Sequence, residues 1–362
     1  MALKQVSITQ WPHPLTAAKA TLLDTALEAG VPYPHDCRSG ECGRCKTQLL
    51  QGDVHHTPCL TEALSREERE QGLVLACRCY PRTDVQVRWL EDAAEPAPFA
   101  PCKQIARVQG LDRTASNVSR VWLALDDGPL DFAAGQYARL GFDDLPVRPY
   151  SMANKAGNDL MEFHIGHQPD GHVSGHVAKH LREGDRVHLE GPFGDAYLRK
   201  IHSSRPGPLI AVAGGTGLAP MLSILRTALD DQPETRARLY FAVRDHEGIY
   251  LEEELLRLAK AHAGLEIRIL LSRPARPGAG HNRLVQTGSV LEALGEDFDS
   301  LADSCLYTAG SPRLVGAVKA LATAKGISPD ALHCDAFWSA PAPPRVRQRI
   351  GLTNRLARLF RS

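Results

Sequence analysis

The chain has 362 residues, and its 42 Lys+Arg balance its 42 Asp+Glu, so the formal net charge is zero. This length exceeds what a single hydrophobic core comfortably serves, which predicts two or three domains. The even charge gives no sign of a nucleic-acid partner or of a charged membrane surface. Nine cysteines are too few for a disulfide scaffold, which leaves the thiols for other chemistry.

Neither the start of the chain nor its uncharged run at residues 206–225 suggests export or membrane insertion. The start, MALKQVSITQWPHP, lacks the charged segment and apolar core of a signal peptide, which favours a cytoplasmic location. Residues 206–225 carry no charge and are long enough to span a bilayer. Glycines and Pro220 interrupt this run, so it predicts a strand, a turn and a helix, without stable membrane insertion.

The first elements surround a cluster of cysteines. An alternating strand is expected in KQVSITQW, and a helix in ATLLDTALEAG, with Thr21 as its N-cap and Gly30 at its C-terminal end. A polar helix in LSREEREQG and a strand in TDVQVRW follow the cysteines.

Three cysteines lie within nine residues, and a fourth follows downstream: Cys37, Cys42 and Cys45, then Cys77 or Cys79. This C-x4-C-x2-C…C spacing is the plant-type [2Fe–2S] pattern. Zinc sites more often use two C-x2-C pairs, and unrelated buried thiols are the other alternative. Gly40 and Gly43 would let the backbone fold tightly around a cluster.

A second domain follows an Ala- and Pro-rich linker at residues 93–102. Residues 103–203 hold short alternating strands separated by Gly and Pro, which indicates an antiparallel barrel or sandwich. This region contains RPYSMAN, and also GHVSGHV, a glycine turn before a helix whose N-terminus can hold phosphate.

Strands then alternate with helices over residues 204–340, which predicts a parallel, doubly wound sheet with ligands at the carboxyl ends of its strands. The segment GGTG falls at such an end. It departs from G-x-G-x-x-G, so taken alone it fits a tight turn as well as a phosphate-binding loop.

RPYS, GGTGLAP and GSP occur in this order, and together they resemble the ferredoxin–NADP reductase superfamily. With the N-terminal cysteine module, residues 1–340 resemble the three-module reductases of bacterial oxygenases, which include Rieske, multicomponent and some cytochrome P450 systems. The resemblance implies a β-grasp [2Fe–2S] ferredoxin (1–92), a linker (93–102), an antiparallel β-barrel for FAD (103–203) and a doubly wound NAD(P) domain (204–340). A Pro-rich basic tail (341–362) lies outside it.

The resemblance also implies roles for individual residues, carried over position by position. The implied cluster ligands are Cys37, Cys42, Cys45 and Cys77, with Cys79 as the runner-up, while Cys59 and Cys102 are bystanders. Arg148 would contact the flavin pyrophosphate, Tyr150 the isoalloxazine, and Ser151 the region of flavin N5. The second flavin-binding segment comprises His164, Ile165, Gly171 and Ser174.

For the dinucleotide, the implied pyrophosphate loop is Gly214, Gly215, Thr216 and Gly217. Gly310 and Pro312 would line the nicotinamide side, and Arg244 and Arg273 would lie near the adenosine ribose. Asp335 and Phe337 would flank the flavin, and together with Ser151 they would form the catalytic group.

The sequence departs from the family pattern at two positions. Many relatives have Cys where this chain has Ala309, and Arg or Lys where it has Gly166. Five histidines lie in HIGHQPDGHVSGHVAKH, but their mixed spacing favours loop surface and flavin contacts over a metal site.

The implied function is electron transfer in aromatic catabolism or a related oxygenase system. A hydride would pass from NADH, the favoured donor, or from NADPH to FAD, and single electrons would then pass through the cluster to a terminal oxygenase. The alternative is a redox-sensing or assembly module in which the cluster is structural.

Overall fold

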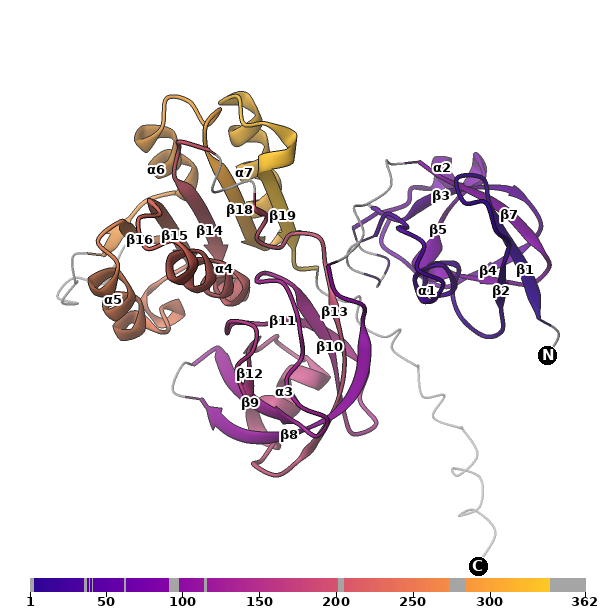
Figure 1. The fold of residues 1–362 in the computed structure, drawn as a ribbon, viewed down its shortest axis with the longest axis horizontal. Coiled ribbons are helices and arrows are strands. Elements are labelled where there is room, and N and C mark those ends of the chain that lie inside the picture. Colours follow the sequence, from indigo (N-terminus) through magenta and orange to yellow (C-terminus); the bar gives the residue numbers. More distant parts are fainter. Residues whose placement is uncertain are drawn as a thin grey trace, which may run out of the picture.

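The computed structural model describes residues 3–35, 38, 40, 42–61, 63–90, 98–113, 116–200, 205–273 and 284–338. They form three lobes, each built around its own main sheet (Figure 1). Each main sheet falls inside one of the three expected domains except at Cys102, the last residue of the expected linker, which begins the first strand of the second sheet. The domain boundaries themselves stay a prediction.

The first lobe is a mixed five-stranded sheet with a helix packed against it, as expected for a β-grasp fold. Its strands are β1 (Lys4–Ile8), β2 (Leu15–Ala17), β3 (Lys46–Gln51), β5 (Leu73–Leu75) and β7 (Val85–Trp89), in the order β2-β1-β7-β3-β5. The β1–β7 pair is parallel and the other pairs are antiparallel. Two helices and a small second sheet complete the lobe: α1 (Leu22–Glu28), α2 (Arg66–Glu70), β4 (Val54–His56) and β6 (Cys79–Pro81).

The ends of α1 follow from local chemistry. The Thr21 hydroxyl accepts a hydrogen bond from the Asp24 N–H at 3.0 Å, which satisfies one of the free donors of the first turn. Gly30 follows the helix with a φ of +74°, in the left-handed region that glycine enters without strain. Both predicted ends are therefore confirmed.

The second lobe is a six-stranded antiparallel sheet that nearly closes on itself. Its strands are β8 (Cys102–Asp112), β9 (Val118–Leu125), β10 (Tyr137–Phe142), β11 (Arg148–Ser151), β12 (Leu160–Gly166) and β13 (Arg186–Phe193), in the order β11-β10-β13-β8-β9-β12. A bridge between Met152 and Phe163 brings the end of β11 to β12, the opposite edge of the sheet. This near-closure makes the lobe a barrel, with α3 (His172–Lys179) following β12.

The third lobe is a parallel six-stranded sheet in the order β17-β16-β15-β14-β18-β19. Its strands are β14 (Leu209–Gly214), β15 (Ala237–Val243), β16 (Leu265–Leu271), β17 (Val285–Thr287), β18 (Cys305–Gly310) and β19 (Leu332–Ala336). The helices are α4 (Leu218–Asp231), α5 (Glu252–Ala261), α6 (Val290–Asp297) and α7 (Pro312–Ala324). Because the strand order reverses between β14 and β18, the carboxyl ends of these two strands mark the expected ligand site.

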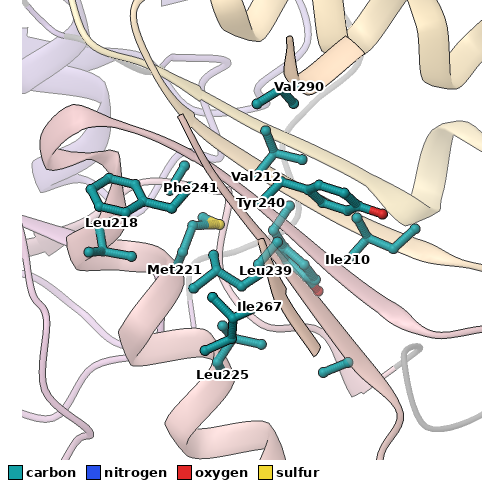
Figure 2. Close-up of a cluster of buried hydrophobic side chains, with 14 of the residues drawn as sticks. Ile210, Val212, Leu218, Met221, Leu225, Leu239, Tyr240, Phe241, Ile267 and Val290 are labelled. Atoms are coloured by element: carbon teal, nitrogen blue, oxygen red, sulfur yellow. The ribbon is translucent and has the colours of Figure 1, made fainter. Parts of the chain in front are cut away.

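Strand β14 is apolar along almost its whole length because it is covered on both faces. Figure 2 shows side chains from α4, such as Met221 and Leu225, beside those of the central strands, such as Leu239 and Ile267. This core fixes where β14 ends and α4 begins, and therefore where the GGTG segment lies.

Candidate redox site

The cysteine loop has the tight backbone that its glycines predict. Gly40 and Gly43 have φ values of +83° and +78°, both in the left-handed region. A Cβ on Gly40 would lie 2.9 Å from Cβ of Cys59, and one on Gly43 would lie 3.0 Å from the carbonyl oxygen of Ala63. Larger residues would therefore push the loop away from the rest of the lobe.

The predicted downstream ligand lies next to this loop. Cys45 is buried, and its carbonyl oxygen accepts a hydrogen bond from the N–H of Ala76 at 3.0 Å, immediately before Cys77. Cys79 is also fully buried, and burial raises the pKa of its thiol strongly. Cys37 lies outside the described residues. Cys45, at the end of the glycine-containing loop, and Cys77, on the adjacent turn, are both buried and fit thiolate ligation of an iron–sulfur cluster.

In the barrel, strand β11 carries the RPYS segment. Tyr150 is half-buried against the barrel core, and burial raises the pKa of its phenol. Ser151 is buried at the end of the strand, opposite Tyr137 of β10. Arg148 is only partly covered, and its Nη1 donates to the carbonyl oxygen of Val147 at 3.1 Å.

Ser151 and Asp335 come together from different lobes. The Ser151 hydroxyl lies near enough to the Asp335 carboxyl on β19 to favour its charged form by hydrogen bonding. Burial raises the pKa of Asp335 to about 7 and the nearby charge of Asp195 acts in the same direction, whereas the Ser151 bond opposes the rise. A carboxyl that titrates near neutral pH beside a hydroxyl can exchange a proton with a bound group.

The chain continues past Asp335 along the end of β18. Phe337 is half-buried, and its N–H donates to the carbonyl oxygen of Gly310 at 2.7 Å. The buried indole N–H of Trp338 has no partner among the described residues. Asp335, Phe337 and Gly310 therefore form one wall, and an unpartnered donor beside it fits a cofactor that carries acceptor atoms.

The GGTG segment is a 3-10 turn, Gly215–Gly217, between β14 and α4. A Cβ on Gly217 would lie 2.2 Å from the carbonyl oxygen of Ala309, and one on Gly214 would lie 2.5 Å from Leu314. Close packing against β18 and α7 thus accounts for these two glycines. Gly215 differs because it is exposed, has a φ of +55° and faces open space. It leaves the loop surface bare at the carboxyl end of β14, as close approach of a pyrophosphate requires.

Gly166 has a packing reason that the sequence did not reveal. A Cβ on Gly166 would lie 3.2 Å from Cγ2 of Thr216, so the end of β12 lies directly against the GGTG turn. A side chain at this position would therefore press on Thr216 unless the turn shifted by a few tenths of an ångström.

Gly171 and Ser174 are locked together at the start of α3. The Ser174 hydroxyl accepts a hydrogen bond from the N–H of Gln168 at 3.0 Å, and a Cβ on Gly171 would lie 2.4 Å from that hydroxyl. The pair shapes the turn that presents the N-terminus of the helix. Neighbouring Ile165 is fully buried in the barrel core, so only its main chain can face a ligand.

The side chain of His164, expected to contact the flavin, is instead bonded to other side chains of the protein. Its ring is fully buried and bonded to Tyr250 of the third lobe at 3.1 Å and to Glu162 at 3.1 Å. Burial lowers the pKa of His164, although Glu162 partly opposes this. The side chain is occupied by protein partners, so any cofactor contact here would use the main chain.

The His164 contact belongs to a polar network that joins the barrel to the nucleotide lobe. Glu162 pairs with Arg120 at 2.5 Å and with Arg226 of α4 at 3.6 Å, and both arginines also reach Glu254 of α5. Burial disfavours the charge of Glu162, but His164 and Arg120 outweigh it and lower the pKa to about 2. Sequence reasoning missed this network because nothing in the motifs connects residues so far apart in the chain.

Arg244 and Arg273 lie beside one another at the ends of β15 and β16. The N–H of Arg273 donates to the carbonyl oxygen of Arg244 at 2.9 Å, and both side chains are exposed. Nη1 of Arg273 lies 3.9 Å from Oδ2 of Asp245. Pro312 is the first residue of α7, with Ser311 as its N-cap.

Among the residues that the structure describes, no group of three or more His, Cys, Asp or Glu side chains is arranged around a single metal ion. Within the same residues, no helix is long and apolar enough to cross a membrane.

Comparison with known proteins identifies all three lobes. Residues 14–82 match the 2Fe-2S iron-sulfur cluster binding domain, residues 106–197 the oxidoreductase FAD-binding domain, and residues 211–320 the oxidoreductase NAD-binding domain. These matches confirm the predicted [2Fe–2S], FAD and NAD modules.

Full-length relatives share this organisation. The ferredoxin–NAD(P)+ reductase component of the naphthalene 1,2-dioxygenase/salicylate 5-hydroxylase systems of a Ralstonia species is 36% identical, over 88% of this chain and 94% of the relative. The reductase subunit of an aromatic O-demethylase from an Amycolatopsis species is 35% identical, over 88% and 94%. The crystal structure of a cytochrome P450 reductase from Amycolatopsis superposes with a TM-score of 0.81 at 32% identity, covering 93% of this chain and all of the other. The chain belongs to the family of three-module ferredoxin–NAD(P)+ reductases, oxidoreductases that combine a [2Fe–2S] cluster, FAD and a nicotinamide dinucleotide.

Proposed function

We propose that this protein is the reductase component of an oxygenase system, which takes electrons from NADH and delivers them singly to a terminal oxygenase. The observation that carries the proposal is the meeting of the barrel with the nucleotide sheet at the GGTG turn. There Gly166 lies directly against Thr216, and Ser151 comes near Asp335 at the end of β18. A flavin bound there would accept a hydride and release single electrons, the conversion that links a nicotinamide to a [2Fe–2S] cluster.

Each group of residues would then have a separate task. Cys37, Cys42, Cys45 and Cys77 would hold the cluster. Arg148, Tyr150 and the α3 N-terminus at Gly171 and Ser174 would bind FAD, and Ser151 and Asp335 would share a proton beside it. Gly215, with Gly214, Thr216 and Gly217, would receive the dinucleotide pyrophosphate, and Phe337 would cover the flavin ring.

The relatives suggest the class of partner. Several are named as components of oxygenase systems for aromatic compounds, such as naphthalene and terephthalate, whereas others serve propane 2-monooxygenase. An aromatic-ring oxygenase is the favoured acceptor for this chain because it is the commoner of the two among the most similar relatives.

The test is to purify the full chain, measure its iron, sulfide and FAD, and follow NADH oxidation with ferricyanide and then with an oxygenase component. We expect one [2Fe–2S] cluster and one FAD per chain, and rapid reduction of both acceptors. Zinc in place of iron would refute the ferredoxin assignment, whereas a cluster that NAD(P)H does not reduce would favour a structural cluster in a sensing or assembly module.

NADH is the favoured donor because Asp245 stands beside Arg273, and a carboxylate there repels the 2′-phosphate of NADPH. We expect a higher kcat/KM for NADH than for NADPH. Asp245→Asn should lower the ratio of kcat/KM for NADH to kcat/KM for NADPH by about tenfold, equivalent to ~1.4 kcal/mol. Preference of the unmodified enzyme for NADPH would reverse the assignment, and Arg273→Ala should then weaken NADPH selectively.

A further inference from the structure

The last residue of β13 and the short stretch of chain that follows it touch all three lobes. We call Phe193–Arg199 the junction segment. Within the barrel, the Phe193 ring lies 5.7 Å from that of Tyr137, and Gln136 donates to the carbonyl oxygen of Gly194 at 3.2 Å. At its other end, the N–H of Arg199 donates to the Tyr307 hydroxyl of β18 at 2.9 Å. The segment is therefore anchored to both lobes that form the proposed flavin site.

The same segment meets the cysteine loop of the ferredoxin lobe. Nη1 of Arg44 lies 2.9 Å from Oδ2 of Asp195, and the guanidinium carbon of Arg38 lies 4.2 Å from the centre of the Phe193 ring. Arg44 stands between Cys42 and Cys45, so this contact is made by the cluster loop itself.

Burial distinguishes the two contacts. The Arg38 side chain is 8% exposed, and its Nε and Nη1 have no hydrogen-bond partner among the described residues. Its Nη2 pairs with the Asp24 carboxylate inside the ferredoxin lobe, and stacking on Phe193 supplies further compensation for this buried cation. The Arg44–Asp195 pair is 39% and 27% exposed, so salt can screen it and mutation can remove it without opening a core.

Asp195 also stands close to the flavin side of the junction. Its charge acts on Asp335, on His333 and on Cys334, and the charge of Arg44 also reaches Cys334. The ion pair is therefore made by the cysteine loop and lies within electrostatic range of the Asp335 carboxyl.

We propose that the junction segment is the docking site for the ferredoxin module inside this chain, and that Asp195, through Arg44, is the positioning residue that holds the cluster loop there for electron transfer. The proposal rests on the proposed function. It adds a named contact that sets the distance between flavin and cluster, separately from the residues that bind either group.

The experiment uses the holoenzyme and two readouts. The first is hydrogen exchange of residues 38–46 and 193–199 without NADH. The second is rapid mixing with NADH, which follows reduction of FAD and of the cluster at separate wavelengths. The variants are Arg44→Gln, Asp195→Asn, their double variant and the conservative Arg44→Lys. The control is Arg66→Gln, which removes the exposed pair with Glu70 on α2.

We expect faster exchange of both segments in Arg44→Gln and Asp195→Asn, and cluster reduction slower by about threefold, as befits a partly exposed pair. The double variant should be no slower than either single variant, because both remove one interaction. Arg44→Lys should retain most of the rate, high salt should mimic the loss, and Arg66→Gln should change nothing.

Unchanged exchange of residues 193–199 in both single variants would overturn the docking assignment, as would additive effects in the double variant. Iron content and the cluster spectrum identify any variant in which the cluster itself is damaged, and Asp195→Asn keeps the test valid if Arg44→Gln is such a variant. Failure of the unmodified enzyme to reduce its cluster with NADH would instead refute the proposed function, whereas the exchange data would still decide the docking.

Discussion

At the scale of single residues, Asp335 is the group whose chemistry depends most on its neighbours. Asp335→Asn keeps the shape of the side chain but can neither hold nor accept an acidic proton. Because the pKa of Asp335 is raised to about 7, the fraction of carboxylate grows as the pH passes through neutrality. We expect turnover with NADH to rise with pH over that range, and Asp335→Asn to lose the rise and to lower kcat on the order of 10²-fold.

The control for this prediction is Asp195→Asn. Removing a neighbouring negative charge lowers the pKa of Asp335, so the rise in turnover should move to lower pH. The measurement is the pH profile of kcat for ferricyanide reduction. If Asp335→Asn kept the original pH profile of kcat, the group that titrates near neutral pH would be a residue other than Asp335.

The two downstream cysteines offer a second test at this scale. Both cysteines pack in the core of the ferredoxin lobe. Cys77 directly follows Ala76, whose N–H donates to the carbonyl oxygen of Cys45. Cys77 keeps 5% exposure, whereas Cys79 begins β6 and is fully buried. Cys77→Ser should therefore lose most of the iron. Cys79→Ser should keep it and destabilise the lobe by ~1 kcal/mol, because a hydroxyl replaces a buried thiol. Iron analysis and thermal unfolding measure the two effects, and iron loss only in Cys79→Ser would exchange the assignments.

At the scale of elements, two glycines of the GGTG turn have different roles: Gly217 is required for packing, and Gly215 is proposed to bind the ligand. Gly217→Ala would place a methyl group 2.2 Å from the carbonyl oxygen of Ala309, so β18 or α4 must move. Gly215→Ala meets no atom, and its left-handed φ costs about 1 kcal/mol. We expect Gly217→Ala to lower the melting temperature more than Gly215→Ala does.

In the variants that fold, the effect on the KM for NADH should be the larger one for Gly215→Ala. Gly215→Ala should raise the KM for NADH severalfold while FAD stays bound, because the added methyl group stands on the open surface of the turn. An unchanged KM would show that the pyrophosphate does not approach Gly215, and the turn would then be explained by packing alone.

These elements also show where sequence reasoning succeeded and where it failed. Strand–helix alternation, caps such as Thr21 and the cysteine spacing are local signals, so the doubly wound sheet, the helix ends and the [2Fe–2S] module could be predicted from them. The FAD and NAD(P) modules were implied by the resemblance of RPYS, GGTGLAP and GSP to a known family. The reasons for Gly166 and Gly217 could not, because each is set by an atom of a distant element, Thr216 or the Ala309 carbonyl. Asp195 carries no motif at all, and its importance follows only from the meeting of three lobes.

At the scale of the whole molecule, the lobes are joined by contacts of unequal strength. The barrel and the nucleotide lobe share the buried network around Glu162, in which loss of one partner would leave an uncompensated charge. The contacts of the ferredoxin lobe with the junction segment include the partly exposed Arg44–Asp195 pair and the Arg38 stack. Flavin and nicotinamide would therefore be held in a fixed relation, whereas the cluster module is attached by contacts that are easier to break.

The basic tail supplies the last prediction at this scale. Residues 341–362 lie outside the described residues, and they begin with a Pro-rich spacer followed by six arginines and no acidic residue. In the part of the chain that the structure describes, the three main sheets are complete without this segment, since their last strand ends at Ala336. Deletion of 341–362 should therefore leave FAD content and NADH-dependent reduction of ferricyanide unchanged.

The oxygenase acceptor distinguishes the remaining roles of the tail. If the tail docks on an acidic surface of the partner or of the ferredoxin lobe, deletion should raise the KM for the partner, and this effect should shrink at high salt because the attraction is screened. If the KM for the partner is the same with and without the tail, at low and at high salt, the tail does not dock and serves only to keep the protein in solution. Loss of FAD on deletion would instead place the tail in the flavin site and move the end of the nucleotide domain beyond residue 340.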